Sequence, residues 1–416
     1  MNTAAPGRLR SLAEPLTSPQ SRGPLLGFAV SELGDGVTTV VVPLVIYQKS
    51  GSLGLLAGSF AGQLFLGSAF AALGGPIADR WNRLNVVTVT FVLRLALVLC
   101  LAAMAGANGP LFVLVGVLAG SLGSFSNPSG EALVRERMRH NPQSIAAARR
   151  ATRLLSSILG PAVGATLIGV GGVRVGLLVD AGTFVVGLAL LLTARRAVPA
   201  GLPAKAHPPK ATPPGFREFF ALARASDVVV PRIVSDMFAS VAVALTITLA
   251  VPYLASLADA PKGAYGWALS AYSIGAMAGV TVAGLVRWRM RTTSLLIRAN
   301  VVYGLCSALA LLGGLWWMLP LSWLLWGISY GPESVVADAR ITAELPPDTL
   351  GRIYGFSTVM AKIASGTGFL LAGLLGRFVS PGDLILWTAL TYSVLAPLVL
   401  LLVSRIRPSG RSGPSA

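Results

Sequence analysis

The stretch GGPIADRWNRLN, Gly74 to Asn85, decides how this chain has to be interpreted. It ends a mostly apolar run that begins near residue 53, and it sets an acidic residue, Asp79, beside Arg80 and close to Arg83. Arginines at the end of an apolar run are explained by membrane topology, whereas an acidic residue contributes little to orientation. Asp79 therefore predicts a function for this stretch beyond topology.

The residues around this stretch fall in long apolar blocks. Hydrophobic residues make up 54% of the 416 residues and charged residues only 12%, whereas a soluble domain is about 25% charged. About 20 apolar residues in a helix cross the roughly 30 Å core of a bilayer, and a helix satisfies its own backbone there. The sequence therefore predicts an all-α membrane protein with twelve transmembrane helices. The candidate spans are about 25–47, 53–77, 86–105, 111–130, 151–170, 174–193, 228–255, 265–286, 293–313, 317–337, 354–376 and 383–404.

The spans fall into two related halves. A stretch rich in proline and basic residues, 194–226, predicts an irregular cytoplasmic linker between them. Shifting the sequence by 205 residues sets Arg135 on Arg340 and Pro142 on Pro347. We expect two pseudo-symmetric six-helix bundles, 25–193 and 227–404, an arrangement known from transporters. The segments 1–24 and 405–416 are predicted to be cytoplasmic tails.

The net charge of +17 follows topology and does not predict a nucleic-acid partner. With the N-terminus inside, most Lys and Arg fall in inner loops and tails, as the positive-inside rule requires. We therefore expect a multi-pass protein of the bacterial cytoplasmic membrane with both termini in the cytoplasm. The outer loops carry Lys49, Arg174, Lys262 and Arg377, and the spans contain Arg94, Arg232 and Lys362.

Ionisable residues inside the first and third spans are candidates for function, because the bilayer makes them costly. In SELGDGVTTVVVP, Glu32 and Asp35 lie three residues apart and share a helix face. Two buried carboxylates hold a proton more readily than they do in water, and losing the charge can bias a conformational equilibrium. Arg94 needs an anion, which is Asp35, Glu32 or a substrate group. For both carboxylates the alternatives are a structural pair with Arg94 or a place near the headgroups.

Acidic residues in later spans are further candidates for lining a water-filled cavity. Asp236 lies in the seventh span, Glu333 near the end of the tenth and Asp180 in the sixth. Each can instead form a buried ion pair or mark the end of a span. Glu131, at the end of the fourth span, is expected to be solvated or to cap its helix.

The sequence offers little for catalysis. Its two histidines, His140 and His207, lie in predicted loops, and Cys100 and Cys306 lie in separate apolar spans. No metal-ligand cluster, Walker loop or hydrolase motif is present. We therefore expect no enzyme activity, no metal site and no cofactor. Uphill transport then needs an ion gradient or an ATPase on another chain.

The opening stretch also resembles a family signature. GGPIADRWNR is similar to the loop G-x-x-x-D-R-x-G-R of the major facilitator superfamily, and Gly75, Asp79, Arg80 and Arg83 match it. Asn82 stands where the second Gly usually is, and we expect it to take the same left-handed turn. The resemblance implies an alternating-access transporter with a central cavity between two six-helix bundles.

The resemblance further implies a cytoplasmic gate. In the family, the loop Asp pairs with an Arg at the inner end of the fourth span, which here is Arg135. A carboxylate is favoured at a helix N-terminus, and a charge-assisted pair there would hold the cytoplasmic side shut. The corresponding stretch of the second half, GLVRWRMRTTS, lacks the Asp, so the latch is one-sided. The expected gate residues are Gly75, Asp79, Arg80, Arg83 and Arg135.

The fifth span points to one branch of this family. Its GPAVGA, residues 160–165, resembles the signature G-P-x-x-G-G of drug:proton antiporters, with matches at Gly160, Pro161 and Gly164 and with Ala165 in place of the last Gly. Close helix packing is the alternative interpretation, because small residues let helices approach. The SELGDGVTTVVVPLVIYQKSGSLG opening is similar to the branch of macrolide-efflux proteins and enterobactin exporters. There Asp35 resembles the first-span acid.

Together these features predict proton-coupled efflux of a small lipophilic compound: a drug, an antibiotic, a siderophore or another natural product. The expected partners are the substrate, protons and the lipid bilayer, and a monomer is expected to suffice. The alternative is an importer or facilitator of a small nutrient with the same fold. A membrane sensor would need a folded soluble domain, which the tails and the linker do not supply.

Overall fold

The computed structural model describes residues 21–106, 109–137, 142–196, 228–286 and 290–405, together with Pro15, Thr17, Ser18 and Ser226. Within these ranges the chain is helical and contains no strand. It forms two compact units: Met1–Pro208 with Ala260–Ser273, and Pro209–Asp259 with Ile274–Ala416. Most of the predicted linker and of the predicted tails lies outside the described residues.

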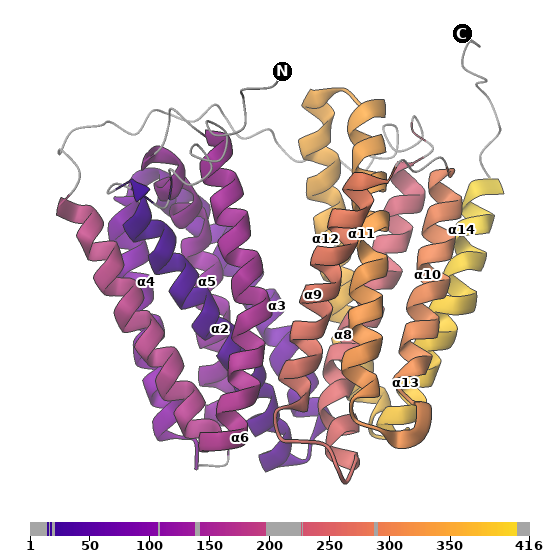
Figure 1. Cartoon of the computed structure of the whole chain (residues 1–416), viewed down its shortest axis with the longest axis horizontal. Helices are drawn as coiled ribbons and strands as arrows, with labels where there is room; N and C mark the ends of the chain where they lie inside the picture. Colours follow the sequence, from indigo (N-terminus) through magenta and orange to yellow (C-terminus); the bar gives the residue numbers. More distant parts are fainter. Residues whose placement is uncertain are drawn as a thin grey trace, which may run out of the picture. The chain divides into compact units, whose positions relative to one another are not determined.

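The first unit is a bundle of long antiparallel helices (Figure 1). Gly51, with φ of 62°, ends the first helix, and the Ser52 hydroxyl accepts the Leu55 amide at 3.2 Å to start the second. Gly172, with φ of 74°, turns the chain inside the last helix, so that this element covers the predicted fifth and sixth spans as two arms. The helices are α2 (Arg22–Ser50), α3 (Leu53–Arg80), α4 (Arg83–Ala103), α5 (Pro110–Arg137) and α6 (Pro142–Arg196).

The turn between α3 and α4 corrects the expectation for Asn82. Its φ of −62° and ψ of 114° are extended and not left-handed. The Asn82 Oδ1 atom accepts the amides of Leu84 at 3.0 Å and Asn85 at 3.3 Å. The predicted left-handed turn is wrong because, in an extended conformation, the Asn side chain caps the first turn of α4 and satisfies two amides that have no partner within the helix.

The second unit repeats this arrangement of helices. Its first helix packs against its fifth, as α2 does against α6 in the first unit. A π-helical turn, η2 (Thr391–Leu395), joins two shorter helices within the last predicted span. The other elements are α8 (Val229–Ser256), α10 (Thr292–Leu309), η1 (Leu312–Gly314), α11 (Met318–Glu344), α12 (Pro347–Leu375), α13 (Pro381–Leu390) and α14 (Ala396–Arg405). The helix α9 (Ala264–Leu285) belongs to the first unit up to Ser273 and to the second from Ile274.

Glycines mark the internal repeat at equivalent helix contacts. In the first unit Gly74 of α3 lies against the backbone of Phe125 in α5, and in the second Gly279 of α9 lies against Gly331 of α11. A side chain at any of these glycines would collide with the neighbouring backbone, as expected where small residues bring membrane helices together. Gly74 and Gly279 are separated by the same 205 positions at which the two halves of the sequence match.

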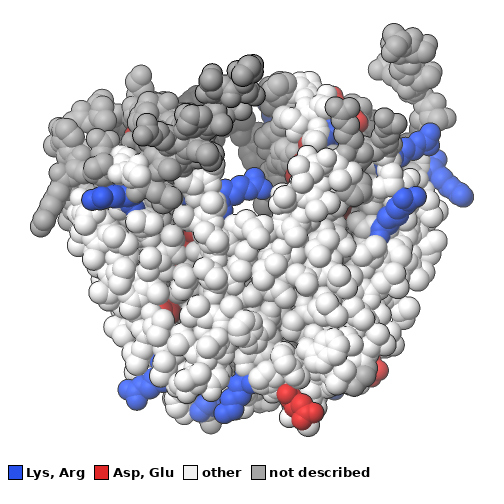
Figure 2. Space-filling view, in the orientation of Figure 1, with Lys and Arg blue, Asp and Glu red and all other residues white. Residues whose placement is uncertain are grey.

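The helices account for all the predicted spans. Nine segments of the described chain are long and apolar enough to cross a membrane, one of which contains both arms of α6. The predicted ninth and tenth spans coincide with α10 and α11. On the face visible in Figure 2, Lys and Arg lie near the ends of the helices and a broad band between them is almost uncharged. The predicted all-α membrane fold is confirmed.

Candidate functional site

An ion pair between the buried Arg94 and the partly buried Asp35 joins α2 to α4 inside the first unit. Two guanidinium nitrogens of Arg94 bind the two carboxylate oxygens of Asp35, one of them at 3.1 Å. The Arg94 Nε atom donates to the carbonyl of Ala119 in α5 at 3.3 Å. Because an arginine keeps its charge even when buried, this two-pronged pair provides the anion that Arg94 requires. Of the three partners considered for Arg94, the structure selects Asp35.

A second carboxylate lies beside this pair. Asp180, on the second arm of α6, is completely buried. The hydroxyl of Thr38, one turn after Asp35 on α2, donates to Asp180 Oδ2. The Thr183 hydroxyl donates to the Asp180 backbone carbonyl at 2.7 Å and lies 3.3 Å from Oδ1. With both carboxylates ionised, Asp35 and Asp180 carry two negative charges and Arg94 carries one positive charge, so one negative charge has no partner among the three. We call these three residues the central cluster.

The central cluster borders a small cavity of about 130 Å³. Thr38, Thr39 and Gln63 add polar groups to its wall, and Val42, Phe60 and Val98 add apolar ones. This volume holds several water molecules, whereas pockets for drug-sized ligands are about 300–1,000 Å³. The cavity therefore suits water and protons, and it is too small for a drug-sized substrate.

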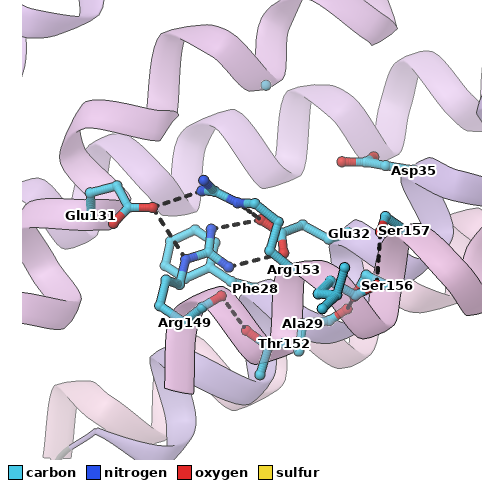
Figure 3. A network of polar contacts seen from close by, with 12 residues as sticks. Phe28, Ala29, Glu32, Asp35, Glu131, Arg149, Thr152, Arg153, Ser156 and Ser157 are labelled. Carbon is cyan, nitrogen blue, oxygen red and sulfur yellow. Dashed lines mark hydrogen bonds and ion pairs between the residues drawn. The ribbon is translucent and has the colours of Figure 1, made fainter. Parts of the chain in front are cut away.

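A second ion network lies along α2, one turn before Asp35 (Figure 3). The Glu32 carboxylate binds the Arg149 guanidinium at 2.6 Å and 3.0 Å. The Glu131 Oε1 atom accepts from Arg153 at 2.7 Å and lies 3.4 Å from the Arg149 Nε atom. Arg149 is the buried centre of this network, with 6% of its side chain exposed. Asp35 lies apart from it in Figure 3, so the shared helix face does not make Glu32 and Asp35 one site.

Three buried phenylalanines connect the two ion networks. Phe28, Phe91 and Phe184 stack edge to face, with centroids 5.8 Å and 5.7 Å apart. The Arg149 guanidinium lies 4.9 Å from the centroid of the Phe28 ring, and that of Arg94 lies 4.7 Å from the centroid of the Phe184 ring. Both arginines thus add a cation–π contact to their ion pairs. The three stacked rings pack between the two networks.

The second unit contains its own buried network. The Arg232 Nη1 atom lies 2.7 Å from Asp236 and 3.0 Å from Glu333, so both predicted carboxylates share one arginine. Glu333 is 1% exposed and also accepts from the hydroxyls of Ser235, at 2.9 Å, and Tyr303. A buried carboxylate with this many donors is held in place. The buried-pair alternative therefore describes Glu333.

The predicted gate residues are only partly described. Arg83 forms an ion pair with Glu136 and donates to the Ala78 carbonyl at 3.3 Å. Gly75 and Arg80 belong to α3, and Arg80 is exposed. The side chain of Asp79 lies outside the described residues, so its pairing with Arg135 stays a prediction. Arg135 lies on a separate cavity beside Arg149.

The Gly-Pro motif of the fifth span packs against α2. A Cβ on Gly160 would lie 2.7 Å from the Leu33 carbonyl oxygen and 2.8 Å from the Gly36 Cα. One on Gly164 would lie 3.0 Å from the Val37 Cα. Glycines at 160 and 164 thus let α6 approach the part of α2 that carries Glu32 and Asp35. Close packing is the interpretation that this geometry favours, with Pro161 next to the contact.

Sequence reasoning missed several members of these networks. Glu131 was expected to be solvated, but it binds two arginines. The spacing of Arg149 and Arg153 at i and i+4 was a usable signal, because it places both side chains on one helix face. Nothing in the sequence pointed to Tyr303 of α10, whose hydroxyl donates to Glu333 of the neighbouring helix α11.

The comparisons with known proteins all match membrane transporters. Residues 25–234 match the family model described as Major Facilitator Superfamily. The Enterobactin exporter EntS of Escherichia coli O1:K1 / APEC is 24% identical over 406 residues, which cover 96% of this chain and 95% of the relative. A POT family transporter in complex with 5-aminolevulinic acid has a TM-score of 0.70 at 13% identity, over 93% of this chain and 97% of that one. A bacterial homologue of the iron transporter ferroportin, in an inward-facing state, has a TM-score of 0.69 at 16% identity, over 95% and 99%.

Proposed function

Because the chain belongs to the Major Facilitator Superfamily and is a multi-pass membrane transporter and not an enzyme, we propose that it exports a small lipophilic compound in exchange for protons. The substrate class is a drug, an antibiotic, a siderophore or another natural product. The enterobactin exporter is similar to this chain over nearly its whole length. Its name supports export and a natural-product substrate. The protein acts as a monomer in this proposal.

The single observation that carries proton coupling is the charge of the central cluster. Asp180 and Arg94 are buried, Asp35 is partly buried, and all three line one water-sized cavity. An uncompensated buried charge is strongly unfavourable. One proton shared by the two carboxylates cancels the excess charge, and the Thr38 hydroxyl can hydrogen-bond to either protonation state of Asp180.

The proposed cycle uses that proton to bias alternating access. A proton from outside enters the cavity and neutralises the cluster, which favours return of the empty transporter to its inward-facing form. Substrate binding then favours the form that releases the proton. Because the 130 Å³ cavity is too small for a drug-sized substrate, proton and substrate act through conformational change and do not compete for one position.

The distribution of charge supports an orientation in the bacterial cytoplasmic membrane with both termini inside. Arg80, Arg83 and Arg135 lie at the end of the first unit where α2 begins. The opposite end carries Lys49 and Arg174. By the positive-inside rule the first of these ends faces the cytoplasm.

Efflux in membrane vesicles tests this function. In inside-out vesicles an imposed proton gradient should drive uptake of a substrate chosen by a thermal-shift screen. Asp35→Asn should abolish that uphill uptake and keep substrate exchange without a gradient, while the exposed Asp259→Asn should behave like the wild type. Full coupled uptake by Asp35→Asn would remove Asp35 from the mechanism. Accumulation only in right-side-out vesicles would identify an importer.

A further inference from the structure

A second, larger cavity lies between the end of α5 and the start of α6. Its volume is about 370 Å³. Four arginines dominate its wall, which has a single acidic residue. The cavity is lined by Glu131, Val134, Arg135, Ile145, Ala146, Arg149, Arg150 and Arg153.

Two of these arginines are neutralised within the protein. Arg149 and Arg153 share the carboxylates of Glu32 and Glu131, with contacts of 2.6 Å between Arg149 and Glu32 and 2.7 Å between Arg153 and Glu131. Two positive charges therefore face two negative ones. Because both carboxylates are already paired, neither Glu32 nor Glu131 is left to neutralise another arginine.

The other two arginines have no compensating carboxylate among the residues whose side chains the structure describes. Arg135 and Arg150 are both exposed, and neither forms a hydrogen bond or ion pair with another residue whose side chain the structure describes. They approach the cavity from different helices, α5 and α6. Two further guanidinium groups thus border the cavity, next to Arg149, which the Glu32 pair and the Phe28 ring hold in position.

We propose that this cavity binds a phosphate group, either from an anionic phospholipid headgroup or as a free phosphate ion. Guanidinium groups bind phosphate oxygens through paired hydrogen bonds, and basic pockets on the cytoplasmic side of membrane proteins bind anionic headgroups. The volume is roughly ten times the ~30 Å³ of one water, and the buried Val134 and Ile145 give it an apolar wall. This site is separate from the central cluster, because the two cavities share no lining residue.

Binding to the purified full-length protein tests the proposal. In detergent at constant ionic strength, inorganic phosphate and glycerol phosphate should raise the melting temperature in a saturable way. Arg135→Gln and Arg150→Gln should each raise the half-saturating concentration at least tenfold. Arg150→Lys should have a smaller effect, because it keeps the charge and loses the paired geometry. Arg22→Gln is the matched control: it removes an exposed arginine at the start of α2, outside the cavity, and should change binding less than twofold.

Nanodiscs separate the two sources of the phosphate. If the headgroup is the ligand, phosphatidylglycerol nanodiscs should stabilise the wild type more than Arg150→Gln, and added phosphate should have no further effect. If free phosphate is the ligand, it should stabilise the wild type equally in phosphatidylglycerol and phosphatidylcholine nanodiscs. The proposal is overturned if neither probe gives saturable stabilisation, or if Arg22→Gln weakens binding as much as Arg150→Gln. These readouts do not require transport, so a failed transport assay leaves them intact.

Discussion

Glu32 and Asp35 lie three residues apart on α2, yet each binds a different arginine. Glu32 holds Arg149 of α6 at 2.6 Å and 3.0 Å, and Asp35 holds Arg94 of α4, with one contact at 3.1 Å. One turn of one helix therefore fastens two other helices through two separate ion networks. A change of charge in either network acts on the packing of α2.

Asp180 should be as important for coupling as Asp35. Asp180→Asn leaves Asp35 and Arg94 as a neutral pair, so the cluster no longer needs a proton to cancel its charge. We expect substrate exchange without a gradient to persist, and the dependence of efflux on external pH to become flat. Efflux measured from about pH 5.5 to 8.5, roughly 1.5 units either side of neutrality, tests this, because buried carboxylates hold a proton toward neutral pH. A pH profile like that of Asp259→Asn would exclude Asp180.

Removing one partner of the Glu32–Arg149 pair should destabilise the protein more than removing both partners. Arg149→Gln leaves the partly buried Glu32 with only the longer contact to Arg153, at 3.6 Å, which should lower the free energy of unfolding by about 2–4 kcal/mol. The double variant Glu32→Gln with Arg149→Gln should recover part of this loss. Denaturation in mixed micelles measures both, with Arg174→Gln as a control at the other end of the bundle. Strictly additive effects would show that the pair contributes no coupling energy.

Gly160 should not tolerate even one methyl group. In Gly160→Ala the Cβ would lie 2.7 Å from the Leu33 carbonyl oxygen, so α2 and α6 must move apart. Overpacking of this kind costs about 1–3 kcal/mol. Gly169→Ala is the matched control, because a Cβ at that position of the same arm meets no atom within 4 Å. Comparable melting temperatures for the two variants would contradict the packing role.

The Tyr303 hydroxyl should contribute measurably to the second unit. Tyr303→Phe removes one donor to the buried Glu333 and leaves Arg232 and Ser235 in place. The loss of a hydrogen bond to a charged group corresponds to about 1.5–3 kcal/mol. Tyr354→Phe, at an exposed tyrosine with only a 3.5 Å contact, should be neutral. Equal unfolding free energies for Tyr303→Phe and the wild type would contradict this.

The predicted latch makes Asp79 a separate test. If Asp79 pairs with Arg135 to close the cytoplasmic side, Asp79→Asn should increase labelling of single cysteines at the α2 start and decrease it at the opposite end. The labels require a background with Cys100 and Cys306 replaced by Ser. The exposed Asp383→Asn should leave both labelling rates unchanged. Wild-type labelling of Asp79→Asn would remove it from the gate.

The helices were predictable because their signal is local. Each predicted span is an apolar block long enough to cross lipid, and each coincides with a helix. The turn at Gly172 lies between the predicted spans 151–170 and 174–193, where one apolar block ends and the next begins. Asn82 shows the limit of local reasoning, since the same residue type suits a left-handed turn or a helix cap, and only the path of the backbone distinguishes them.

The sequence by itself determined which charges fall within the apolar spans, among them Glu32, Asp35, Arg94, Asp180, Arg232, Asp236, Glu333 and Lys362. Only the tertiary structure decided how they pair. Arg94 lies 59 positions from Asp35, Arg149 lies 117 from Glu32, and Glu333 lies 101 from Arg232. Hydrophobicity along one helix fixes its depth in a bilayer, but it does not fix its rotation or its neighbours. The packing of helices from distant parts of the chain therefore sets which carboxylates are neutralised and which retain the charge that a proton can cancel.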